Sequence, residues 1–89
     1  MKIMAVCGSG LGSSFMMEMN IKKALAKLGV EAEVGHTDLA SVVADDADLF
    51  VMAKDIAASS SVPEDKIVVV KNIISVVEFE EKLTAYFNR

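Results

Sequence analysis

The sequence lacks much of the material from which several classes of protein are built. Its 89 residues include no tryptophan, one proline, one histidine and one cysteine. A single cysteine cannot form an internal disulfide, and it suits a reducing compartment. Basic residues are also few, because 9 Lys and Arg against 13 Asp and Glu give a net charge of −4. Nucleic acids and anionic membranes attract basic surfaces, so we expect neither to be the main partner.

Long apolar runs are missing as well. No stretch approaches the roughly 20 consecutive apolar residues of a membrane helix. The apolar stretch before Cys7 is too short for the hydrophobic region of a signal peptide. We therefore expect a cytoplasmic protein that reaches a membrane only through a partner. With 53% hydrophobic residues, the chain is long enough to bury the core of one domain over residues 1–89 and too short for a second.

The most informative residues lie near the start of the chain, where residues 2–14 read KIMAVCGSGLGSS. The apolar residues 3–6 do not alternate with polar ones, which is typical of a strand covered on both faces. This strand ends at Cys7. Three glycines then stand at every second position, which predicts positive φ angles and backbone N–H groups turned inward. Either Ser13 or Ser14 is expected to cap the helix that follows.

The glycines and the helix start together predict an anion-binding loop with Cys7 at its mouth. Inward N–H groups and the positive end of a helix both stabilise a bound anion, and a phosphoryl group is the natural occupant. The thiolate is the nucleophilic form of cysteine, and a helix N-terminus stabilises it. Cys7 is therefore the candidate nucleophile, although a lone cysteine can also be an inert core residue. The candidate phosphate-binding residues are Gly8, Ser9, Gly10, Leu11, Gly12, Ser13 and Ser14.

The rest of the chain alternates between helix and strand patterns. Apolar residues at helical spacing predict a helix over Phe15–Leu28, ended by Gly29 as its C′ residue. Met17 belongs to the apolar face, whereas Met16 and Met19 fit either packing or a docking surface. Alternation predicts an edge strand over residues 30–36, and Asp38 is expected to cap a short helix.

Two more strands and a helix complete the pattern. Leu49–Ala53 and the apolar residues within 66–71 predict buried strands. The Ser75–Glu78 spacing is typical of a capping box at the start of a final helix. Strands that alternate with helices predict a four-stranded parallel sheet of order 2-1-3-4 flanked by helices, which is a flavodoxin-like α/β fold.

Three further polar residues are weaker site candidates. In the predicted sheet the third strand lies beside the first, so the loop that leaves it with Lys54 and Asp55 borders the crevice at the switch point. We favour ordinary loop charges for both. The single histidine, His36, could move a proton or contact a phosphate. Its place at a strand end favours a solvated surface histidine instead.

The loop resembles a known family. Residues 5–17, AVCGSGLGSSFMM, resemble the phosphorylation loop of the IIB component of the bacterial phosphotransferase system (PTS) for sugar uptake, in its ascorbate and galactitol branch. The methionine-rich helix start and the Gly-x-Gly-Ser-Ser ending are more similar to the ascorbate-specific members. Only this loop is specific, while the remaining resemblance is one of size and α/β pattern.

The resemblance implies a phosphotransferase that works as a phosphoryl carrier. In that family a cytoplasmic EIIA protein carries a phosphohistidine, and the IIB cysteine, here Cys7, takes the phosphoryl group. The substrate, a sugar or here L-ascorbate, is then phosphorylated at the membrane transporter EIIC. The resemblance thus implies a cytoplasmic protein that associates peripherally with a transporter and uses no cofactor or metal.

The loop also resembles that of low-molecular-weight tyrosine phosphatases, whose pattern is Cys, five residues, then Arg. Here Ser13 stands at the arginine position, and a hydroxyl replaces a bidentate clamp poorly. Asp55 is the nearest candidate acid, and it lacks the Asp-Pro context of those enzymes. Both departures favour a phosphocysteine that waits for an acceptor. A phosphatase-like enzyme and a flavodoxin-like binding or redox-sensing module remain as alternatives.

Overall fold

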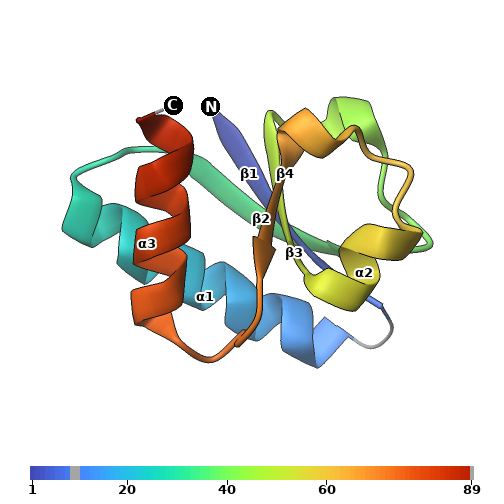
Figure 1. Ribbon diagram of the computed structural model, residues 1–89, viewed down its shortest axis with the longest axis horizontal. Coiled ribbons are helices and arrows are strands. Elements are labelled where there is room, and N and C mark those ends of the chain that lie inside the picture. The colour runs from blue at the N-terminus through green and yellow to red at the C-terminus, as the bar shows by residue number, and fades with distance from the viewer. Residues whose placement is uncertain (9–10, 89) are drawn as a thin grey trace.

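The computed structural model describes residues 1–8 and 11–88, and of residues 11–13 the backbone alone. Its strands form one parallel sheet of order β2-β1-β3-β4, which confirms the predicted order (Figure 1). The strands are β1 (Lys2–Cys7), β2 (Glu33–Asp38), β3 (Leu49–Ala53) and β4 (Ile67–Val70). The helices are α1 (Leu11–Leu28), α2 (Lys54–Ser59) and α3 (Val76–Phe87), with short 3-10 turns η1 (Ala44–Asp46) and η2 (Glu64–Lys66).

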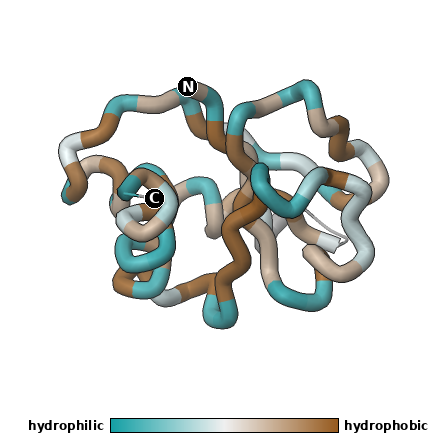
Figure 2. The backbone as a smooth tube through the Cα atoms, turned by 45° about the horizontal axis from the view of Figure 1, so that its top comes forward, coloured by the Kyte–Doolittle hydropathy of each residue, from teal (hydrophilic) through white to brown (hydrophobic). Residues whose placement is uncertain are grey.

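Helices cover both faces of the sheet. Figure 1 shows α1 and α3 on one face and α2 on the other. Alternate residues of β1 accordingly enter two different clusters: Ile3 and Ala5 pack against α1 and α3, whereas Met4 and Val6 pack on the α2 side. Figure 2 shows hydrophobic residues along the central strands and hydrophilic ones on the outer loops. The continuous apolar run of β1 is thus explained by burial on both faces.

The first helix begins earlier than predicted, at Leu11 rather than Phe15. Ser13 and Ser14 therefore lie inside its first turns, and their prediction as N-caps is wrong. Ser14 is fully buried. The far end is as predicted, because Gly29 has a φ of 72° and follows the last helical residue as a C′ glycine.

Three other local predictions are wrong. The second strand runs over Glu33–Asp38 rather than 30–36, because β1 continues to Cys7 and pairs it with Asp38. Asp38 does not start a helix; its Oδ1 accepts the N–H of Ser41 at 2.8 Å and closes a turn. Lys54 and Asp55 open α2 rather than a loop.

The start of α3 follows the predicted capping box only in part. The hydroxyl of Ser75 accepts the N–H of Glu78 at 3.3 Å, as an N-cap does. The Glu78 carboxylate does not reach back to Ser75. It accepts the backbone N–H groups of Lys71 and Asn72 at 2.6 and 2.7 Å, which fixes the loop between β4 and α3. These two hydrogen bonds lower the pKa of Glu78 below its ordinary value, and the bond from Lys71 has the larger effect. Burial raises the pKa and so partly opposes them.

Candidate functional site

Cys7 is the last residue of β1, at the edge of the sheet where the carboxyl ends of the strands meet. It is buried, with 5% of its surface exposed. It lines a cavity of about 280 Å³ together with Val6, Gly8, Met17, Ala53, Asp55, Ile56 and Ile73. The carbonyl of Cys7 accepts the N–H of Leu39 at 2.7 Å, which holds the strand end in place. Cys7 therefore borders a small cavity at the predicted switch point.

Gly8 also lines this cavity. Glycine suits this position for a reason other than the predicted positive φ. Of the described glycines, Gly29 alone has a positive φ, so Gly8 does not need glycine for that conformation. A Cβ on Gly8 would instead lie 2.8 Å from Cδ1 of Ile56. Glycine at this position thus allows α2 to approach the end of β1 closely.

The other predicted loop residues are described only in part. Ser9 and Gly10 lie outside the described residues, as do the side chains of Leu11, Gly12 and Ser13. The backbone of these last three residues forms the first turn of α1. The helix start therefore comes directly after the loop, and the first N–H groups of a helix have no partner within the helix itself.

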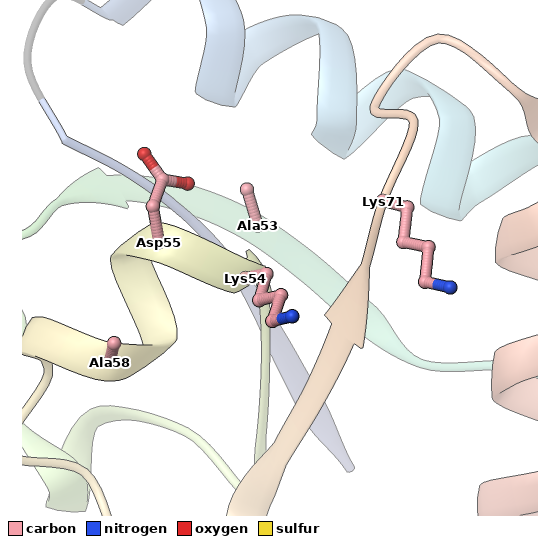
Figure 3. A pocket seen from close by; sticks show the side chains of 5 residues that line it. All are labelled: Ala53, Lys54, Asp55, Ala58 and Lys71. Carbon is pink, nitrogen blue, oxygen red and sulfur yellow. The ribbon is translucent and has the colours of Figure 1, made fainter.

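Asp55 shares the cavity with Cys7, whereas Lys54 does not line it. A second hollow of about 490 Å³ adjoins it, lined by Ala53, Lys54, Asp55, Ala58 and Lys71 (Figure 3). Figure 3 shows the carboxylate of Asp55 pointing away from the amino groups of Lys54 and Lys71. Ala53 and Asp55 are common to both hollows and thus form the boundary between them. The structure brings Asp55 to the candidate site and leaves Lys54 beside it.

His36 is only partly solvated, with 30% of its side chain exposed, and its predicted place at a strand end is wrong. It lies within β2, and its Nδ1 is 2.6 Å from Oε1 of Glu18 on α1. Its ring also packs against Phe15, with centroids 5.7 Å apart. The hydrogen bond with His36 is the main cause of a lowered pKa at Glu18; burial opposes it, and the ion pair with Lys22 adds to it. His36 is absent from the wall of the Cys7 cavity.

Sequence reasoning missed Ile73 and the residue that positions it. Ile73 follows β4 and lines the Cys7 cavity. Its carbonyl accepts the side-chain N–H of Asn20 at 2.8 Å, and Asn20 is buried on α1. Asn20 could have been found from the sequence, because it is a polar residue next to Ile21 and three positions after Met17 on the apolar face of the helix. A buried amide at such a position needs a hydrogen-bond partner.

A family model described as the lactose/cellobiose-specific IIB subunit of the PTS matches residues 2–85. The chain belongs to the PTS IIB family. Among its relatives, the ascorbate-specific PTS EIIB component of Salmonella typhimurium is 33% identical over 85 residues, which cover 92% of this chain and 84% of that protein. The component of the same name from Shigella flexneri is 32% identical with the same coverage. These relatives confirm the predicted resemblance to ascorbate-type EIIB proteins.

The fold has a second relative of lower sequence similarity. A low-molecular-weight protein tyrosine phosphatase from Bacillus subtilis superposes with a TM-score of 0.57 over 99% of this chain and 91% of that one, at 15% identity. This likeness confirms the predicted phosphatase-like fold.

As an EIIB protein, the chain is a phosphotransferase component and a phosphoryl carrier of the PTS. No helix in the described part of the chain is long and apolar enough to cross a membrane.

Proposed function

We propose that Cys7 of this EIIB protein accepts a phosphoryl group from the phosphohistidine of an EIIA protein and passes it to a substrate at a membrane EIIC transporter. The observation that carries this proposal is the position of Cys7, which lines a cavity at the point where β1 leads into α1. In the first step the N–P bond of the phosphohistidine breaks and an S–P bond forms at Cys7. In the second step that bond breaks, and an oxygen of the substrate takes the phosphoryl group.

The proposed loop holds the phosphoryl group mainly by backbone N–H groups, over Gly8 to Ser14. Two observations support this. The chain is acidic overall, and, of the described residues, none that lines the Cys7 cavity is basic. Stabilisation by amides and by the start of α1 requires no lysine at that point. The protein would work in the cytoplasm and associate with the transporter at the membrane.

We propose ascorbate as the substrate because the curated relatives carry that name. The description of the family model names lactose and cellobiose instead. Membranes that contain the cognate transporter, supplied with this protein and its donor, separate the two possibilities. Phosphorylation of ascorbate is expected, and phosphorylation of a disaccharide in its place would refute this assignment.

Incubation with a phosphorylated EIIA protein tests the carrier role. We expect a mass increase of one phosphoryl group that maps to Cys7 by peptide analysis. The Cys7→Ser variant should not gain it, and acceptance by that variant would show that the nucleophile is wrong. Gly10→Val should also lose acceptance while it keeps the fold, because a side chain there would fill the amide concavity. Normal loading of a folded Gly10→Val protein would refute the amide loop.

A further inference from the structure

The two steps of the proposed relay differ in their need for a base. In transfer from a phosphohistidine to Cys7, the imidazole nitrogen that leaves phosphorus takes up the proton of the thiol, so no further base is needed. Transfer from the phosphocysteine to an alcohol does, because the attacking hydroxyl must lose its hydrogen. A positioned carboxylate commonly accepts such a proton in phosphoryl transfer to a hydroxyl. A base beside the phosphocysteine would therefore act in the second step alone.

Asp55 is placed for this role. Of the described residues that line the Cys7 cavity, it alone carries a carboxylate. Strand β3 lies next to β1, with Val6 opposite Met52 in register, so the two strand ends are neighbours. Asp55 follows the end of β3 by two residues, in the first turn of α2. The topology thus brings Asp55 to the same cavity as Cys7.

The surroundings of Asp55 leave its carboxylate available. Its side chain is exposed, and no hydrogen bond or ion pair joins it to another described residue. Figure 3 shows it turned away from Lys54 and Lys71, the cations of the neighbouring hollow. Because it belongs to both hollows, it lies where a substrate in the larger one would meet the Cys7 cavity.

We propose that Asp55 is the general base of the second step, which rests on the proposed function of Cys7. The hydroxyl oxygen of the substrate forms a bond to phosphorus, and the S–P bond breaks. Its electron pair returns to sulfur as the thiolate. The hydroxyl proton passes to the Asp55 carboxylate, which later releases it to water. Asp55 takes no part in loading from the phosphohistidine.

The Asp55→Asn variant separates the two steps, because its amide keeps the shape and cannot accept the proton. It should load from phosphorylated EIIA at the wild-type rate. Its single-turnover transfer to substrate, at saturating transporter membranes, should fall about 100-fold. The membrane concentration for half-maximal rate should not change. Asp55→Glu should restore part of the rate.

Asp45→Asn is the matched control, because Asp45 is exposed and lies in η1, before β3 and at the other end of the sheet. It should load and transfer as the wild type does. Wild-type transfer by Asp55→Asn would overturn the base role, and so would a loss of loading, since loading needs no base. If wild-type Cys7 does not load at all, the proposed function fails first, and the loading assay shows this before any variant is compared.

Discussion

His36 on the edge strand β2 donates a side-chain hydrogen bond to Glu18 on α1, with Nδ1 and Oε1 2.6 Å apart. The side chain of Glu18 is only 14% exposed, and its other carboxylate oxygen forms an ion pair with Lys22. The pair ties the outermost strand to the helix that starts at the candidate site. It also gives the stability of this protein a specific dependence on pH.

Glu18→Gln should lower the free energy of unfolding near neutral pH by about 1 kcal/mol, because Gln can accept the same hydrogen bond from His36 but lacks the charge that strengthens it. The His36 hydrogen bond lowers the pKa of Glu18 from 4.5, so the folded state holds its carboxylate ionised to lower pH than the unfolded state does. That stabilisation is complete above the unfolded pKa and is lost as pH falls through the lowered folded pKa. Urea unfolding of the wild type and of Glu18→Gln should therefore show a difference in the free energy of unfolding that narrows below pH 4.5.

The exposed Glu31 provides the control for this series. Glu31→Gln should follow the wild type closely at every pH, since an isolated surface carboxylate contributes little. A difference between wild type and Glu18→Gln that stays constant from neutral pH down to strong acid would contradict the assigned role of Glu18.

Met17→Ala and Met16→Ala should differ sharply although the residues are neighbours. Met17 is 1% exposed and belongs to the core cluster with Ile3 and Ala5, whereas Met16 is 46% exposed. Removing a buried methionine side chain costs about 2–5 kcal/mol. The exposed substitution should change the free energy of unfolding by less than about 0.5 kcal/mol. Denaturant unfolding of the two variants checks this, and equal losses would show that the burial of α1 is wrong.

The methionines illustrate what sequence pattern predicts well. Helical spacing assigned Met17 to the core correctly, and strands alternating with helices gave the sheet order, because burial and chain connection leave few arrangements. The pattern could not fix contacts made between distant side chains. His36 looked solvated because nothing near it in sequence pairs with it; its partner Glu18 lies 18 residues away and meets it only across the α1–β2 contact.

The same limit applies at the candidate site. The apolar run that ends at Cys7 identified the nucleophile candidate, and the structure places that residue at the carboxyl end of β1, as expected. The reason for Gly8 could not be read from the sequence, because it depends on Ile56, which arrives from α2. Helix starts were also misplaced at Leu11 and Lys54, although β1 and β3 end where the pattern predicts, because sequence pattern does not define the first turn of a helix to within a few residues.

Ser75→Ala and Glu78→Ala should destabilise the protein to different degrees. Ser75 accepts one N–H at 3.3 Å, and losing an N-cap costs about 1 kcal/mol. Glu78 accepts two N–H groups at 2.6 and 2.7 Å through its carboxylate. Bonds to charged groups are stronger, so Glu78→Ala should cost about 2 kcal/mol or more. Urea unfolding ranks the two, and a larger loss for Ser75→Ala would contradict the role of Glu78 in the β4–α3 loop.

Gly8→Ala tests the close approach of α2 to the candidate site. The new Cβ would lie 2.8 Å from Cδ1 of Ile56, so that side chain must move. Because the contacting atom is the flexible end of the side chain, we expect a loss of about 1 kcal/mol in the free energy of unfolding, at the lower end of the range for overpacking. Thermal and urea unfolding measure it. In the proposed carrier, the displaced Ile56 would also disturb the cavity wall and slow the loading of Cys7.

Ile56→Val removes the Cδ1 atom that the new methyl group meets, so it separates this contact from other effects of alanine at position 8. In the Ile56→Val background, Gly8→Ala should cost less by about 0.5 kcal/mol or more. Gly35→Ala is the control: its Cβ would lie 3.4 Å from Sδ of Met4, an ordinary contact. That substitution should be neutral or slightly stabilising and should not couple to Ile56. If Gly8→Ala costs the same in both backgrounds, the glycine is required for the conformation of the loop itself rather than for the approach of Ile56.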